Sequence, residues 1–286
     1  MNKSSIFFYI GASLKHIFMR FIRSVFYIIN YKTLIITAVS VFTTWLCIEM
    51  NLYADFPMTL IGLAIVFPIV FAINSAYKRR ERALLSLAEI TGYALGIYQS
   101  IKNMVDNYTP EDNERVQTKI VDLFTAIKHF LESPRDGAKE KEIDIYQKLD
   151  EISKEIRHLR DQGLAGRFAS RLNQYLTRMT VAIDNMKVIF YYRTPRTLRA
   201  YSKVFIFSFP IVFAPYFAHI AMNFTYGLGY VLPVLFTFIL ISLDNIQEHL
   251  EDPYDQVGED DINLNIEDIE IMVSKKSNRT TNLKLK

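Results

Sequence analysis

The stretch LAIVFPIVFAINSAYKRRER, residues 63–82, changes abruptly from apolar to strongly basic. Its first part places Leu63, Phe67 and Phe71 at positions i, i+4 and i+8, which puts these three side chains on one stripe of a helix. Its last five residues include four Lys or Arg side chains. Basic residues that flank an apolar span collect on the cytoplasmic side of a membrane. The stretch therefore predicts a helix that crosses a membrane and ends in the cytoplasm.

Long uncharged runs on both sides of this stretch predict further spans. Half of the 286 residues are hydrophobic, with 21 Phe and 17 Tyr. About 20 apolar residues are needed to cross about 30 Å of hydrocarbon. The run from 56 to 77 contains no Asp, Glu, Lys, Arg or His, and the run from 204 to 243 contains only His219 and is about twice as long as one span needs. We predict four spans, at about 33–48, 57–77, 201–222 and 228–243.

The distribution of charge predicts the orientation of these spans. The formal net charge is only +3, but the two signs are segregated along the chain. The basic residues lie beside the spans, whereas a nucleic-acid-binding protein gathers them on a soluble face. The loop from 49 to 56 carries the acids Glu49 and Asp55 and no base, so it is expected outside. We predict an integral protein of the cell membrane, inner or plasma, with both termini in the cytoplasm and no nucleic-acid partner.

The N-terminal 32 residues combine five basic side chains with several aromatic ones and contain no acid. Such a segment is typical either of an interfacial helix on the inner leaflet or of a simple positive flank. Its basic residues interrupt the apolar ones, unlike a cleaved signal peptide, so we expect it to be retained. Cys47 is the single cysteine, and an intramolecular disulfide is therefore excluded.

Between residues 78 and 200 the apolar residues recur at three and four spacing, which predicts helices and no strands. Breaks are expected at Pro110, Pro134, the pair Gly163 and Gly166, and Pro195. Because no Gly/Ser-rich linker separates this region from the spans, we expect it to continue the membrane bundle. The predicted fold is thus an all-α membrane protein with five segments: 1–32 basic and aromatic, 33–77 the first two spans, 78–200 cytoplasmic helices, 201–246 the last two spans, and 247–286 an acidic tail.

Eleven acidic residues and no Lys or Arg occur between residues 244 and 274. This tail is expected on the same side of the membrane as the basic N-terminal segment. Electrostatic attraction predicts that the tail contacts that segment, or the same segment of a neighbouring subunit.

Sequence patterns for catalysis are lacking. The five histidines are scattered without the spacing of metal ligands, and there is neither a Gly-rich phosphate loop nor a G-x-S-x-G sequence. We predict that the protein is not an enzyme and requires no cofactor.

Several separated pieces of sequence are similar to the bestrophin family of ion channels. Residues 71–79, FAINSAYKR, resemble the point at which bestrophins leave the membrane, although Arg80 and Glu81 stand where the family usually has two tryptophans. Residues 194–201, TPRTLRAY, are similar to the Thr-Pro and Tyr pattern of bacterial members. Residues 250–254, LEDPY, and 258–261, GEDD, resemble the family's Asn-Pro-Phe-Gly and acidic run. The order of elements agrees from about residue 20 to 264.

The resemblance implies a homopentamer in membrane lipid whose second spans line a central pore for small inorganic ions. Leu63, Phe67 and Phe71 then fall at the family's neck, where hydrophobic rings gate by dewetting and phenyl edges can face a passing anion. The alternative interpretation is that this stripe packs against neighbouring helices, as apolar residues of any span do. The family's second, cytoplasmic aperture is assigned to Leu164, with Phe168 as the next choice.

The acidic run raises the question of calcium, because animal bestrophins use it as a calcium clasp and bacterial relatives do not. Calcium takes six to eight oxygen ligands, and the run offers several. The candidate ligands are Asp255, Glu259, Asp260, Asp261 and Asn263. Gln256 and Val257 are inserted relative to the family pattern, so the alternative is a solvated acidic face that pairs with Arg20, Arg23 or Lys32.

The resemblance leaves the sign of the conducted ion open between chloride or other anions and Na⁺ or K⁺. Basic residues after the neck favour anions, whereas an acidic tail at the exit favours cations. A different class of function is also open, namely a membrane scaffold or assembly protein that conducts nothing. A transporter is disfavoured because no ionisable residue lies in the middle of a span.

Overall fold

The computed structural model describes residues 30–105, 108–193, 195–223, 227–256 and 261–274. Within these ranges the regular elements are all helices, which confirms the predicted all-α class. The chain divides into two compact units. The first unit combines residues 1–76 with 194–250, and the second combines 77–193 with 251–286.

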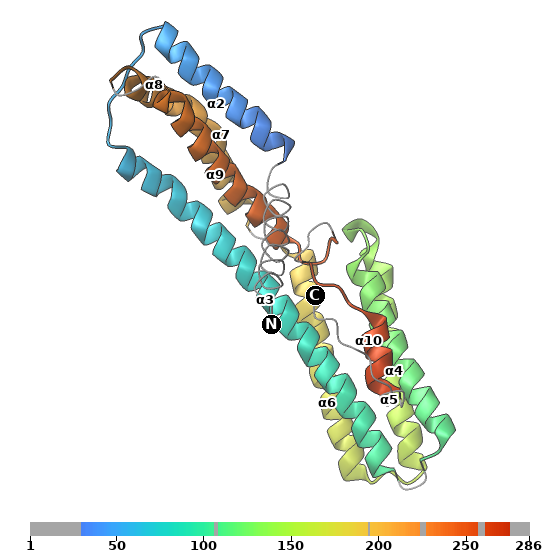
Figure 1. Ribbon diagram of the computed structural model, residues 1–286. Helices are drawn as coiled ribbons and strands as arrows, with labels where there is room; N and C mark the ends of the chain where they lie inside the picture. Colours follow the sequence, from blue (N-terminus) through green and yellow to red (C-terminus); the bar gives the residue numbers. More distant parts are fainter. Residues whose placement is uncertain (1–29, 106–107, 194, 224–226, 257–260, 275–286) are drawn as a thin grey trace, which may run out of the picture. The chain divides into compact units, whose positions relative to one another are not determined.

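The first unit contains the apolar helices (Figure 1). They are α2 (Tyr31–Glu49), the beginning of α3 (Met58–Met104), α7 (Arg196–Val212), α8 (Ala214–Asn223) and α9 (Leu228–Glu251). Among the described residues, three stretches are long and apolar enough to cross a membrane: Tyr31–Glu49, Arg199–Asn223 and Leu228–Glu251. These correspond to the first, third and fourth predicted spans. The second span, at 57–77, stays a prediction, and the side chains of residues 58, 60 and 61 lie outside the described ones.

Helix α2 begins at a capping box and carries hydroxyl groups on its buried face. The Asn30 side chain accepts a hydrogen bond from the backbone N–H of Lys32 at 2.8 Å, which satisfies a donor that has no partner in the first turn. Further along, the Thr43 hydroxyl donates to the carbonyl of Pro210 in α7 at 2.9 Å. This bond joins two helices in a region where the hydrophobic effect alone gives helices little reason to associate.

The third predicted span is interrupted. We predicted one span at 201–222, but the helix ends at Val212 and α8 starts at Ala214. Pro215 explains the break, because it has no N–H with which to bond the carbonyl four residues earlier. Phe213, at the break, is 1% exposed and stacks on Phe209 with ring centroids 4.4 Å apart. The bend is therefore anchored in the aromatic core of this unit.

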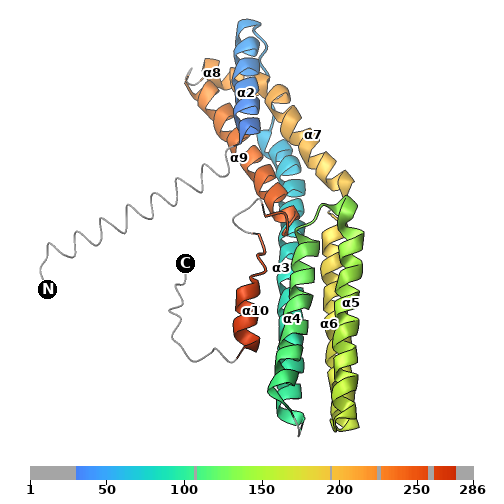
Figure 2. The same ribbon diagram turned by 90° about the vertical axis from the view of Figure 1, so that its right-hand side faces the viewer.

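The second unit is a bundle of long helices, shown in Figures 1 and 2. It contains the rest of α3, α4 (Pro110–Leu131), the 3₁₀ turn η1 (Arg135–Gly137), α5 (Ala138–Asp161), α6 (Gly166–Tyr191) and the short α10 (Ile266–Val273). The helices break at Pro110, at Pro134, between Gly163 and Gly166, and before Pro195, as predicted. Thr109 caps α4 and shares a capping box with Asp112, which explains why this helix starts where it does.

The end of the chain's described part packs on this bundle. After α9 the residues Tyr254, Ile262 and Leu264 are buried in its core, at 1%, 6% and 7% exposure. Helix α10 then lies along α4 (Figure 2). Its residues Ile269 and Val273 are buried, and the Gln117 side chain donates a hydrogen bond to the Val273 carbonyl. The segment that we predicted as an acidic tail thus contains apolar residues that attach it to the helices.

Candidate functional site

The apolar stripe on α3 faces away from the core of its own unit. Leu63, Phe67 and Phe71 are 52%, 51% and 61% exposed. On the opposite side of the same helix, Ile65 and Ile69 are buried at 3% and 0%. The stripe therefore does not pack against the described helices of its own unit, and it is available to lipid, to another copy of the chain or to a pore.

This exposed face is wider than the sequence analysis predicted. Val66 and Val70 are 41% and 49% exposed, so the apolar surface follows the spacing i, i+3, i+4, i+7 and i+8. The rings of Phe67 and Phe71 stack on this face with centroids 6.1 Å apart. The i+3 spacing was present in the sequence and would have identified both valines. The face continues past its apolar part to the exposed Asn74 and Lys78.

Leu164 does not lie on a comparable surface. It is 2% exposed and belongs to the hydrophobic core of the second unit, next to the turn at Gly163, whose φ is +109°. Its backbone N–H bonds the carbonyl of Leu159, which closes the end of α5. Because the side chain fills the interior of the bundle, the structure gives no support to an aperture at Leu164. Phe168 is half-buried against the same core.

The predicted calcium ligands are only partly described. Asp255 and Asn263 are exposed, Asp261 is intermediate, and Glu259 and Asp260 lie outside the described residues. The Ile262 N–H donates a hydrogen bond to the Pro253 carbonyl at 2.8 Å. Ile262 is a core residue of the bundle, at 6% exposure. The described residues contain no group of three or more His, Cys, Asp or Glu that could hold a metal ion.

One basic residue of the N-terminal segment pairs with an acid of the predicted tail. Lys32 forms an ion pair with Glu248 at 3.0 Å, and Lys203 pairs with the same carboxylate at 3.4 Å. This contact between residues 1–32 and 244–274 is of the kind that the charge pattern predicted, and Glu248 belongs to α9. Arg20 and Arg23 lie outside the described residues.

Within the basic cluster that follows the stripe, Arg79 has a specific role. Its guanidinium donates hydrogen bonds to the carbonyls of Ile189 and Tyr192 at the C-terminal end of α6. These carbonyls have no partner within the helix, and a cation is favoured at a helix C-terminus. Burial lowers the pKa of Arg79 from its ordinary value. Arg79 thus caps the C-terminal end of α6 and links α3 to α6 within the second unit. The charge pattern alone did not reveal this contact.

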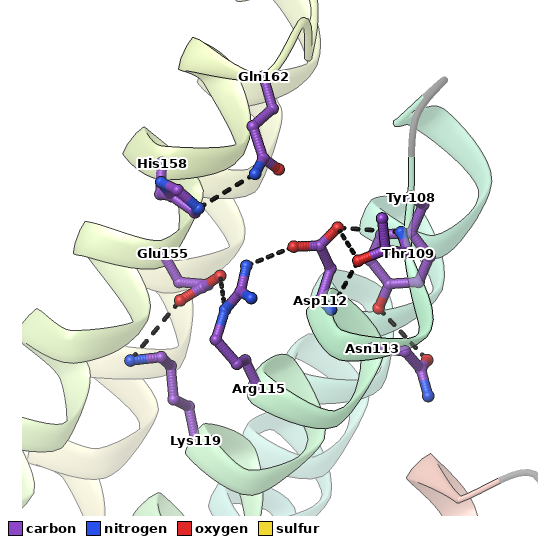
Figure 3. Close-up of polar contacts among 9 residues, drawn as sticks. All are labelled: Tyr108, Thr109, Asp112, Asn113, Arg115, Lys119, Glu155, His158 and Gln162. Atoms are coloured by element: carbon purple, nitrogen blue, oxygen red, sulfur yellow. Dashed lines mark hydrogen bonds and ion pairs between the residues drawn. The ribbon is translucent and has the colours of Figure 1, made fainter.

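A second ionic cluster joins α4 to α5 (Figure 3). The Glu155 carboxylate is 8% exposed and accepts from Arg115 Nε at 3.3 Å, with Lys119 Nζ at 3.6 Å. Arg115 also bonds Asp112, the partner of Thr109 in the capping box of α4. Every charge in this cluster has an opposite charge beside it, which is the arrangement of a structural network rather than of a catalytic site.

Comparisons with known proteins identify the fold. No family profile matches the sequence, and no curated protein matches it. Among solved structures, a bacterial bestrophin homologue from Klebsiella pneumoniae matches with a TM-score of 0.72 and 17% sequence identity over 85% of this chain and 96% of the other. A variant of a Klebsiella pneumoniae bestrophin homologue matches with a TM-score of 0.73, 16% identity and coverage of 85% and 97%. The resemblance noted in the sequence is thus confirmed at the level of the fold, and with the apolar helices it indicates an integral membrane protein.

Proposed function

We propose that the chain is a bestrophin-like ion channel in which α3 from five copies surrounds a central pore. The observation that carries this proposal is the apolar face of α3, with Leu63, Phe67 and Phe71 half-exposed on a helix whose other side is buried. The rings of Phe67 and Phe71 stack on this exposed face, in a chain with the bestrophin fold. A helix that faces only water or lipid would not require such stacked rings. In the pentamer, each of the three positions forms one ring of side chains around the pore. These three rings follow one another along the pore and constitute the neck.

The chemistry of the neck follows from its residues. Between Leu63 and Phe71 the exposed face carries no charge, so a narrow passage lined by it would hold water poorly. An ion that enters loses hydration without compensation, and the rings therefore act as a gate. The positive edges of phenyl rings favour a small anion such as chloride, and Na⁺ or K⁺ is the alternative.

Flux through liposomes tests conduction. We expect purified chain, reconstituted with a salt gradient, to pass small monovalent ions, and the reversal potential in asymmetric salts gives the sign of the ion. Recording with and without calcium tests whether the run from Asp255 to Asn263 contributes to regulation. Intact pentamers without flux under any ionic condition would contradict the channel and favour the non-conducting scaffold.

Substitutions in the stripe test the neck itself. Replacing Leu63, Phe67 and Phe71 together by Ala should raise the ion flux several-fold, because the wider and less apolar passage wets more easily. The matched control replaces Leu34, Ile35 and Phe42 of α2 by Ala, since these residues are 68%, 58% and 58% exposed on another apolar helix. Equal flux in the wild-type chain and the α3 variant would assign the stripe to packing or lipid contact.

A further inference from the structure

A cavity of about 550 Å³ lies in the second unit. Its walls come from the end of α4, the turn before α5, the end of α6 and the loop after α9. The lining residues are Leu131, Glu132, Ser133, Pro134, Arg135, Phe190, Arg193, Asp252, Tyr254, Asp255 and Gln256. Its volume lies in the range of cavities that bind small molecules.

Two arginines of this cavity share one carboxylate oxygen. Asp252 Oδ2 accepts from Arg135 at 2.6 Å and from Arg193 at 2.8 Å. Arg135 is further fixed by a bond from its Nε to the Phe190 carbonyl at 2.9 Å, and its guanidinium lies 5.6 Å from the centre of the Phe190 ring. Each guanidinium has five N–H donors. The two guanidinium groups that share this carboxylate oxygen therefore retain donors for a further acceptor.

Tyr254, in the wall of the same cavity, supplies a second and independent observation. Its side chain is 1% exposed, and its hydroxyl has no hydrogen-bond partner among the described residues. A buried hydroxyl without a partner is costly, and such groups are usually satisfied by a bound molecule or water. Tyr254 lines the cavity together with Arg135, Arg193 and Asp252.

These groups define the chemistry of a ligand. The Tyr254 hydroxyl and the arginine N–H groups are donors, so the group that they bind must accept hydrogen bonds and is favoured by negative charge. Asp252, Asp255 and Glu132 also line the cavity, and they would repel a doubly charged phosphate more than a singly charged group. The planar fork of a guanidinium matches the two oxygens of a carboxylate.

We propose that this cavity binds a small molecule through its carboxylate group, held by Arg135, Arg193 and Tyr254. The carboxylate lies beside Asp252 on the arginine side of the cavity, and the apolar wall of Leu131, Pro134 and Phe190 contacts the rest of the molecule. The site is independent of the proposed channel activity, so its test does not need ion flux.

The experiment measures thermal unfolding and calorimetric binding of the full chain in detergent. The probes are acetate as a plain carboxylate, glycine as a carboxylate with an ammonium group, and phosphate, all at equal ionic strength in chloride. We expect saturable binding and a rise in Tm with acetate, glycine or both, and a smaller response to phosphate. Binding of glycine alone indicates that the acids of the cavity pair with the ammonium group and still supports the carboxylate site.

Variants separate the site from nonspecific ionic effects. Tyr254→Phe should abolish the ligand-induced rise in Tm without lowering the Tm of the ligand-free chain, because the hydroxyl has no partner to lose. Arg193→Gln should weaken binding about tenfold, the loss expected for a charge-assisted hydrogen bond. The controls are Tyr175→Phe and Arg167→Gln, which change the same residue types in α6, at positions that do not line the cavity.

Three outcomes would overturn the proposal. They are the absence of saturable binding by either carboxylate, equal weakening by Arg167→Gln and Arg193→Gln, and a lower ligand-free Tm in Tyr254→Phe, which would show that the hydroxyl already has a partner.

Discussion

Single buried charges hold the second unit together at defined points, and Glu155 is the clearest of them. Its carboxylate is almost fully buried between α4 and α5 and faces both Arg115 and Lys119 (Figure 3). A buried ion pair contributes little over an apolar pair, but removing one partner leaves the others without their counter-charge. Arg115 is 39% exposed and keeps Asp112, so solvent reduces the penalty here.

We therefore predict that Glu155→Gln lowers the free energy of unfolding by about 1–2 kcal/mol, a fraction of the loss at a fully buried site. Thermal unfolding of the chain in detergent measures this effect. Asp150→Asn is the control, because Asp150 and Lys154 form an exposed pair at 2.6 Å on the same helix. Equal stability of Glu155→Gln and Asp150→Asn would show that the cluster contributes nothing.

The contact between α5 and α6 contains the second set of paired charges. Lys187 lies 2.8 Å from Glu142 and 3.0 Å from Asp184, and Tyr191 donates to Glu142 at 2.9 Å. The hydrogen bond from Lys187 lowers the pKa of Glu142. Burial raises the pKa of Asp184, but hydrogen bonds from Tyr146 and Lys187 outweigh it, and the net pKa lies below its ordinary value.

These shifts predict loss of stability on the acid side. Carboxylates with a lowered pKa in the folded state stabilise the fold above their unfolded pKa of about 4, and this contribution is lost as the pH falls through the folded pKa values. The pKa of Lys187 is raised, so its contribution is complete below about pH 10 and is lost only at higher pH. We expect Tm to decrease below about pH 4, and to decrease less in Lys187→Met. Lys148→Met, at a more exposed pair with Glu151, should retain the wild-type pH dependence.

At the scale of the elements, the packing of α8 against α9 depends on a glycine. A Cβ atom added to Gly229 would lie 2.2 Å from the Cβ and 2.8 Å from the Cα of Ala221, and 3.0 Å from the Phe217 carbonyl oxygen. Two of these atoms belong to the backbone, so the helices would have to move apart. Small residues at such crossings let membrane helices approach closely.

We predict that Gly229→Ala destabilises the first unit by about 1–3 kcal/mol, the usual range for overpacking. The fraction of monodisperse protein and the Tm in detergent measure the effect. Gly62→Ala is the matched control, since a Cβ at Gly62 meets nothing within 4 Å. If Gly229→Ala were as stable as Gly62→Ala, the close crossing of α8 and α9 would not constrain the fold.

At the scale of the whole molecule, the predicted orientation in the membrane remains a proposal. It rests on the four basic residues between 78 and 82 and on the acids of the loop from 49 to 56. The native chain has one cysteine, Cys47, so a Cys47→Ser background allows single cysteines to be introduced elsewhere.

Labelling intact cells with a membrane-impermeant maleimide tests the orientation. Leu52→Cys, at a residue that is 49% exposed in the loop after α2, should be labelled in intact cells. Glu140→Cys, at the exposed start of α5, should be labelled only after lysis. The opposite pattern would reverse the topology and with it the assignment of the termini.

The sequence by itself determined the helical class, the apolar runs and the helix breaks at Pro110, Pro134 and Pro195, because these depend on local backbone chemistry and on short periodicity. The tertiary structure decided which face of α3 is buried, since a stripe at i and i+4 is equally compatible with a core, a lipid surface and a pore. It also placed Leu164 in the core and Tyr254 beside Arg135 and Arg193. These placements bring together residues more than 50 positions apart, and such contacts follow from the packing of whole helices, which no local pattern encodes.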